Sequence, residues 1–180
     1  MALREYLEQH EINALLEHAE HEEARLLMLT QWRAGLRVSE VLALEVRDIQ
    51  MKQARPQVAI RQGKGKKSRY VPMHPELTAA YMVALNYRRV ARTGRIFGVG
   101  RMTVHRWIKR AYESAVESRK LPPGRNISSH TLRHSFARHV LMEGVPINRL
   151  QVWLGHAQLQ TTLDYLQILP DPEGIMEGIS

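Results

Sequence analysis

Residues 58–72 read Val-Ala-Ile-Arg-Gln-Gly-Lys-Gly-Lys-Lys-Ser-Arg-Tyr-Val-Pro, and this stretch decides how the fold is interpreted. Its two ends, residues 58–61 and 69–72, are short runs of the type that favours β-strands. A polar segment with two glycines separates them, which is typical of a β-hairpin. The turn is strongly positively charged because it contains three lysines, Lys64, Lys66 and Lys67. The stretch therefore predicts one small antiparallel β element with a cationic tip, and a solvated tip of this kind needs no function of its own.

On both sides of the hairpin, hydrophobic residues recur at the spacing of amphipathic helices. Glycines at positions 35, 144 and 155 stand where such helices are expected to end. The expected helices are two within 9–34, a third from Ser39, and then 76–91, 101–118, 130–143, 146–155 and 158–167. We therefore expect a mostly α fold with a small antiparallel β-hairpin, in the α+β class.

Length and composition indicate a globular protein. The chain has 180 residues, of which 44% are hydrophobic and 24% charged, so we expect one domain over residues 1–180 with a real core. The absence of cysteine excludes a disulfide framework, a cysteine metal site and a cysteine nucleophile. Charges in the first residues argue against a signal peptide, and no apolar run approaches the roughly 20 residues of a membrane span. We expect a cytoplasmic protein that does not enter a membrane.

The net charge of +8 is unevenly distributed along the chain. Residues 1–50 hold 5 Arg against 9 Glu and 1 Asp, a balance of −5, whereas the remaining 21 basic and 8 acidic groups give residues 51–180 a balance of +13. Such an excess favours a polyanionic partner, either nucleic acid or an acidic membrane surface. A basic surface that only keeps the protein soluble is the simpler alternative.

The segment His130-Thr-Leu-Arg133-His134 places an imidazole and a guanidinium on one helix face, because positions three apart are neighbours. This pairing suits a phosphate group, although an ordinary solvated face would explain the segment equally well. A zinc site was also considered, since His130 and His134 are four apart. The zinc-hydrolase motif requires Glu directly after the first His, and Thr131 stands there, so no metal is expected.

Two further segments carry candidate functional residues. Arg37, in Gly35-Leu-Arg-Val-Ser-Glu40, lies at a break between helices, where it can point into a cleft or form a surface ion pair. His156 follows Gly155 at a helix end, where the backbone can approach an anion closely. On a helical wheel, Tyr165 falls well away from the stripe of Leu159, Leu163 and Leu166. Its hydroxyl can therefore face a ligand, or it is an ordinary interface tyrosine.

Together these residues form one chemical set. Two arginines can neutralise a phosphodiester, a tyrosine can act as an oxygen nucleophile, and the histidines and a lysine can move protons. In this order the set resembles the tyrosine recombinase (phage integrase) family. The similarity lies in Gly-Leu-Arg37-Val-Ser-Glu, in the lysine hairpin around Lys64, in His130-Thr-Leu-Arg133-His-Ser-Phe-Ala, in Leu-Gly-His156 and in Tyr165, and it covers roughly residues 9–168.

The resemblance implies a role for each of these residues. Tyr165 would attack a DNA phosphodiester, form a 3′-phosphotyrosyl bond and release a 5′-hydroxyl. Arg37 and Arg133 would bind the scissile phosphate, and Lys64 would protonate the leaving oxygen. His130 would serve as acid/base and His156 would hydrogen-bond the phosphate. The reaction would need no cofactor or metal, and the protein would be a monomer that assembles into a tetramer on two sites in double-stranded DNA.

The resemblance also leaves differences and alternatives. Family members usually carry a separate N-terminal domain that clamps the DNA, and here the catalytic pattern begins near Met1, so that domain is expected to be absent. One alternative is a type IB topoisomerase-like enzyme. Another is a non-catalytic regulator in which residues 101–110 are the recognition helix of a helix-turn-helix. The residues expected to contact DNA are Lys66, Lys67, Arg69, Arg101, Thr103, Arg106, Lys109 and Arg110.

Overall fold

The computed structural model describes residues 6–61, 68–87 and 93–155, in which helices predominate. The elements in these ranges are α1 (Gln9–Glu17), α2 (Glu22–Ala34), α3 (Val38–Leu42), the 3₁₀ helix η1 (Val46–Asp48), β1 (Ile49–Gln50), β2 (Gln57–Ile60), β3 (Arg69–Pro72), α4 (Pro75–Tyr87), α5 (Arg101–Glu117), α6 (Ser129–Met142) and α7 (Ile147–Leu154).

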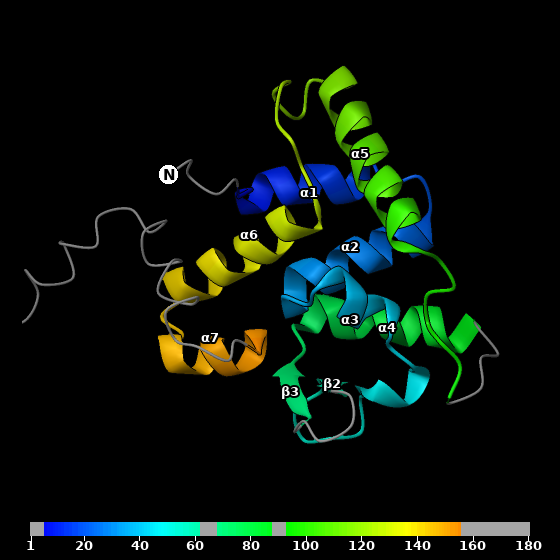
Figure 1. Ribbon diagram of the computed structural model, residues 1–180, viewed down its shortest axis with the longest axis vertical. Coiled ribbons are helices and arrows are strands. Elements are labelled where there is room, and N and C mark those ends of the chain that lie inside the picture. The colour runs from blue at the N-terminus through cyan, green and yellow to red at the C-terminus, as the bar shows by residue number, and fades with distance from the viewer. Residues whose placement is uncertain (1–5, 62–67, 88–92, 156–180) are drawn as a thin grey trace, which may run out of the picture.

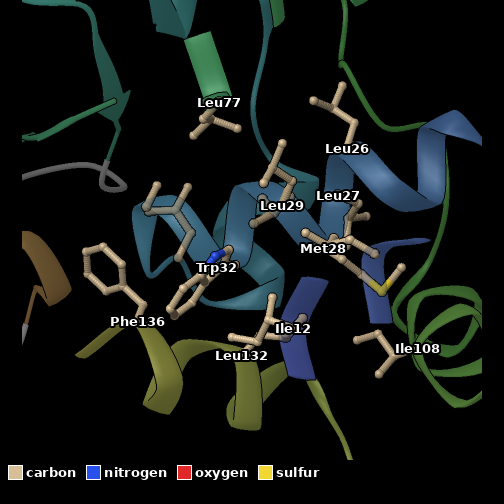
Figure 2. Packing of buried hydrophobic residues seen from close by; sticks show 14 of the residues in the cluster. Ile12, Leu26, Leu27, Met28, Leu29, Trp32, Leu77, Ile108, Leu132 and Phe136 are labelled. Carbon is tan, nitrogen blue, oxygen red and sulfur yellow. The ribbon is translucent and has the colours of Figure 1, made fainter. Parts of the chain in front are cut away.

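Helix α2 lies at the centre of the molecule (Figure 1) and contacts α1, α3, α4, α5 and α6. Its position follows from its sequence, because every residue from Leu26 to Ala34 is buried. Figure 2 shows Trp32 of α2 close to Leu132 and Phe136 of α6, with Ile12 of α1 beside them. Burying side chains of this size removes apolar surface from water, which is the main stabilising contribution to the fold.

The boundaries of α2 and α6 follow from local interactions. The His21 ring accepts a 3.2 Å hydrogen bond from the Ala24 amide at the start of α2, and Gly35 ends that helix in the left-handed conformation with φ +62°. At the start of α6 the Ser128 amide donates to the Thr131 hydroxyl at 3.1 Å. Thr131 therefore completes a capping box with the N-cap residue Ser128, at the position where the zinc-hydrolase motif would require Glu.

The sheet has three antiparallel strands in the order β1-β2-β3. β2 pairs with β3 from Gln57 opposite Pro72 to Ile60 opposite Arg69, so the ladder runs up to the segment that contains the lysines. β3 in turn contacts α7, which packs against α6. Figure 1 shows the hairpin and α7 at the same end of the molecule. The pairing brings the base of the lysine turn next to the helix that precedes His156.

The expected fold class is confirmed, and the expected helices through residue 155 are all present with small differences at their ends. One element differs from the expectation, and one expected helix is not described. Strand β1 was not expected, because its two residues are too few to show an alternating pattern. The expected helix 158–167 lies outside the described residues. Within the ranges that the structure describes, no helix is long and apolar enough to cross a membrane.

Candidate active site

Gly35 joins the first arginine segment to the second. A Cβ atom at Gly35 would lie 2.2 Å from Cδ1 of Phe136, so only glycine lets α6 approach this closely. That approach allows Nη1 of Arg133 to donate a 2.6 Å hydrogen bond to the Gly35 carbonyl. The glycine that ends α2 therefore places Arg133 beside the chain segment that carries Arg37.

The C-terminal end of α7 gathers three arginines. Nη2 of Arg133 donates to the Leu154 carbonyl at 2.8 Å, and Nη1 of Arg37 lies 3.4 Å from the same oxygen. Nε of Arg69 donates to the Trp153 carbonyl at 2.8 Å. The last carbonyls of a helix lack partners within the helix and carry its negative dipole end, so guanidinium groups satisfy both needs. The two predicted catalytic arginines, Arg37 and Arg133, therefore meet at the Leu154 carbonyl, which lies two residues before His156 in the sequence.

Glu40 is the carboxylate at the centre of this cluster. It accepts from Nη1 and Nη2 of Arg69, both at 2.9 Å, and from the main-chain amide of Arg37 at 2.8 Å. Nη1 of Arg37 is 3.3 Å from Glu40 and Nη1 of Arg133 is 3.8 Å from it. Burial favours the protonated carboxyl, but the hydrogen bonds and charge of Arg69, with smaller contributions from Arg37 and Arg133, hold the pKa of Glu40 below 4.5. The cluster therefore contains three guanidinium groups and one carboxylate.

The two predicted phosphate ligands differ in exposure. The Arg133 side chain is 4% exposed, whereas the Arg37 side chain is 41% exposed and its hydrogen bonds are longer. Arg133 is therefore fixed in the interior by carbonyls, and Arg37 extends its guanidinium to the surface. A planar guanidinium can bind two phosphate oxygens through parallel N–H groups, and the Arg37 guanidinium is exposed where such a ligand can approach.

The other predicted site residues are placed only in part. His130 is exposed near the start of α6, three residues before Arg133, and its ring centroid is 6.4 Å from that of His134. The remaining predicted catalytic residues, Lys64, His156 and Tyr165, lie outside the described residues, as do Lys66 and Lys67. Their roles stay predictions.

Arg69, one of the predicted DNA contacts, is buried in the structure. Its side chain is 6% exposed, and its guanidinium is occupied by Glu40 and by the Trp153 carbonyl. A solvent-facing phosphate contact was expected because Arg69 belongs to a cationic stretch. The contacts with Glu40 and Trp153 come from segments 29 and 84 residues away, which a local pattern cannot reveal. Glu40 is not among the predicted site residues, although it stands three residues after Arg37, the spacing of a capping carboxylate.

The predicted DNA contacts Arg101, Thr103, Arg106, Lys109 and Arg110 all lie on α5. The buried face of this helix is Val104, Trp107, Ile108, Ala111, Tyr112 and Ala115, which confirms the expected amphipathic pattern. The four basic side chains are exposed and Thr103 is half-buried. Lys109 pairs with Glu113 at 3.7 Å and Arg110 with Glu20 at 2.6 Å, so part of the positive charge is already balanced.

The helix-turn-helix interpretation does not fit the connection between α4 and α5. A helix-turn-helix joins its two helices through a turn of about 3–4 residues. Here α4 ends at Tyr87 and α5 begins at Arg101. Because α5 also packs on α1, α2, α3 and α6, it is an integral helix of this fold and not the second helix of such a motif with α4.

The chain is similar to known proteins over most of its length. The model of the phage integrase family matches residues 5–171. A tyrosine recombinase from Pseudothermotoga lettingae is 37% identical over 164 residues, which are 88% of this chain and 54% of that protein. The crystal structure of XerA recombinase is similar with a TM-score of 0.78 and 26% identity, covering 98% of this chain and 63% of that one.

The share of each similar protein that the chain covers differs between an isolated domain and the curated relatives. The catalytic domain of bacteriophage HP1 integrase, at 25% identity and a TM-score of 0.68, is matched over 97% of this chain and 95% of that domain. The chain spans about half the length of the curated relatives that it matches. It corresponds in extent to an isolated catalytic domain of this fold. On the family model and the sequence identities, the chain belongs to the phage integrase family, the tyrosine recombinases.

Proposed function

We propose that this chain carries out site-specific recombination by cleaving and rejoining DNA strands through a covalent 3′-phosphotyrosyl intermediate. The observation that carries the proposal is the convergence of Arg37 and Arg133 on the Leu154 carbonyl, two residues before His156. A preorganised pair of guanidinium groups stabilises the negative charge that builds on a phosphodiester when a nucleophile attacks it. Membership of the tyrosine recombinase family supports the same chemistry.

In the proposed reaction the Tyr165 hydroxyl attacks the phosphorus atom. A bond forms between phosphorus and the tyrosine oxygen while the bond from phosphorus to the 5′ oxygen breaks. Lys64 donates a proton to that leaving oxygen, and His130 accepts the proton of the tyrosine. His156 hydrogen-bonds the phosphate. Attack by the 5′-hydroxyl of another strand reverses these steps, and the joined strand has a new partner.

The geometry around Arg133 suits the demands of this reaction. Its hydrogen bonds to two carbonyls fix the guanidinium before DNA arrives, so little reorganisation is needed in the transition state. Each cleavage is reversed by an equivalent attack, so the phosphate bond energy is kept in the phosphotyrosyl link. For this reason the proposed reaction uses neither a nucleotide nor any other cofactor, and no metal.

We propose double-stranded DNA as the partner. The excess of +13 over residues 51–180 supports it, as do the exposed basic side chains of α5. We further propose that the chain is a monomer without DNA and assembles as a tetramer on two DNA sites, because strand exchange requires four cleavable strands to be held together.

A covalent trap tests this function. Nicked duplexes with a randomised binding sequence are incubated with the protein, and species that resist denaturing electrophoresis are recovered and sequenced. We expect a protein–DNA adduct of defined sequence, because the nick lets the short 5′-hydroxyl strand diffuse away and prevents rejoining. The selected site is then placed once or twice on a plasmid. Recombination that requires two sites supports the proposal, whereas relaxation of a one-site plasmid would indicate a topoisomerase and the absence of any adduct would contradict the proposal.

A further inference from the structure

The Arg69 side chain makes polar contacts with two segments that are far from it in the sequence. Its guanidinium joins Glu40 of α3, through two 2.9 Å hydrogen bonds, to the Trp153 carbonyl at the end of α7. It also packs against Gly155, where an added Cβ would lie 2.9 Å from Cζ of Arg69. Arg69 itself opens β3 and lies five residues after Lys64. One side chain thus connects the lysine hairpin, the first arginine segment and the residue before His156.

The charge balance gives this arrangement a second consequence. Among the described residues, Glu40 is the carboxylate that pairs with all three guanidinium groups, and both of its oxygens make their shortest side-chain contacts with Arg69. Arg37 lies 3.3 Å from Glu40 and Arg133 lies 3.8 Å from it. If Arg69 were absent, Arg37 and Arg133 would be the remaining cations within 4 Å of the half-buried carboxylate among the described residues. They would then be drawn toward Glu40 and away from a phosphate.

We infer that Arg69 is a positioning residue for the proposed cleavage reaction: it pairs with Glu40, which limits the pull of that carboxylate on Arg37 and Arg133, and it fixes the end of α7 against the base of the lysine hairpin. This inference rests on the proposed function. It also assigns Arg69 a role that is distinct from a phosphate contact, namely to join Glu40 to the Trp153 carbonyl.

The variant Arg69→Gln tests the inference, with Arg61→Gln as the matched control. Arg61 directly follows the other strand of the hairpin and also pairs with carboxylates, with Asp48 at 2.8 and 2.9 Å and with Glu45 at 2.9 Å, but it is more exposed, and no contact among the described residues joins it to Glu40 or α7. Single-turnover cleavage is measured at saturating protein on the trapped site. We expect Arg69→Gln to lower the rate about 100-fold, the cost of misplacing a reacting group by about 1 Å. Arg61→Gln should stay within about threefold of wild type.

Two further variants separate positioning from simple loss of folding. Glu40→Gln keeps an oxygen that can accept from the Arg37 amide but removes the negative charge. The double variant Arg69→Gln/Glu40→Gln should therefore cleave about tenfold faster than Arg69→Gln alone, since coupled neighbours are not additive. Arg69→Lys, which keeps the charge but not the planar fork, should be intermediate. A double variant no faster than Arg69→Gln would contradict the role of Arg69 in occupying Glu40.

Binding measurements separate positioning from a DNA contact. Loss of one phosphate contact lowers the magnitude of the log–log salt slope by about 0.9 on duplex DNA. We expect Arg69→Gln to keep the wild-type slope while its saturated cleavage rate falls. A reduced slope with an unchanged saturated rate would overturn the inference and restore Arg69 as a phosphate ligand.

A measurement without DNA keeps this test independent of the proposed function. Amide hydrogen exchange is followed by mass spectrometry on a peptide that covers the end of α7. Exchange there should be faster in Arg69→Gln than in wild type or Arg61→Gln, because the Trp153 carbonyl loses its partner. Unchanged exchange would contradict the inference even if cleavage fell. If wild type forms no adduct but exchange rises as expected, the proposed function fails and the structural role of Arg69 stands.

Discussion

Arg133 and Gly35 lie 98 residues apart in the sequence, yet Nη1 of Arg133 donates a 2.6 Å hydrogen bond to the Gly35 carbonyl. The contact forms because Gly35 ends α2 in a left-handed conformation and leaves room for the Phe136 ring of α6. The same short turn continues to Arg37. One glycine, Gly35, therefore lets α6 pack closely against the end of α2. It also brings Arg133 close to Arg37, the other predicted phosphate ligand.

The variant Gly35→Ala should destabilise the protein by about 2–5 kcal/mol. A left-handed φ costs an L-residue roughly 1–2 kcal/mol, and overpacking against Phe136 adds about 1–3 kcal/mol. Urea denaturation measures the free energy of unfolding. Gly124→Ala is the matched control, because Gly124 has φ +85° but nothing within 4 Å of an added Cβ. It should lose only the conformational part, and equal losses in the two variants would show that the Phe136 contact does not restrict this position.

Alanine substitutions at Arg37 and Arg133 should lower the free energy of unfolding by different amounts. Arg133→Ala removes a buried charge, takes this donor from the Gly35 carbonyl and leaves the Leu154 carbonyl with the long contact to Arg37, so the free energy of unfolding should fall by about 3 kcal/mol or more. Arg37→Ala removes a half-exposed side chain with long contacts and should cost less than about 1 kcal/mol. Both variants should lose adduct formation, which is measured at a temperature where each is folded. An Arg37→Ala protein that cleaves at the wild-type rate would remove Arg37 from the phosphate site.

DNA binding should depend steeply on salt and should involve α5. Arg106→Ala should lower the magnitude of the log–log salt slope by about 0.9, the contribution of one neutralised phosphate. Arg110→Ala should lower it less, because Arg110 is already paired with Glu20. The control is Lys120→Ala, because Lys120 is exposed and lies beyond the C-terminal end of the 17-residue helix α5. Fluorescence anisotropy at several salt concentrations measures all three, and an affinity that does not change with salt would contradict phosphate-dominated binding.

Lys64 should be the general acid, in preference to Lys66 and Lys67. Each lysine is changed to Ala, and single-turnover cleavage is measured on normal DNA and on DNA with sulfur as the 5′ bridging atom at the cut. A thiolate leaves without a proton, so only loss of the true acid should be rescued by sulfur. Slow cleavage of both substrates by Lys64→Ala, or a near wild-type rate on normal DNA, would show that the assignment is wrong.

The helices and the hairpin could be predicted from the sequence because they are local: each follows from hydrophobic spacing and from the residues at its ends. The pairing of the motifs could be predicted only through the family resemblance. The position of Arg69 could not, because a cation at the end of a strand looks the same whether it faces water or Glu40. That distinction depends on how α3, β3 and the end of α7 meet, which is a tertiary property.

The structure also narrows the choice of alternative nucleophiles. Tyr81 is fully buried, its hydroxyl is 2.8 Å from that of Thr30, and burial raises its pKa well above the ordinary value. The Tyr112 hydroxyl donates to the Pro122 carbonyl at 2.7 Å and accepts from the Arg125 amide at 2.9 Å. Both hydroxyls are engaged in the fold. Tyr70, which is 49% exposed on β3, is therefore the more demanding control for the assignment of Tyr165.

The most direct test compares Tyr165→Phe with Tyr70→Phe on the trapped nicked site. Tyr165→Phe removes only the nucleophilic oxygen, so DNA binding should stay near the wild-type affinity while adduct formation is abolished. A loss of six decades in rate corresponds to about 8 kcal/mol of activation free energy. Tyr70→Phe should form adduct at the wild-type rate. A Tyr165→Phe protein that still becomes covalently attached to DNA would contradict the account.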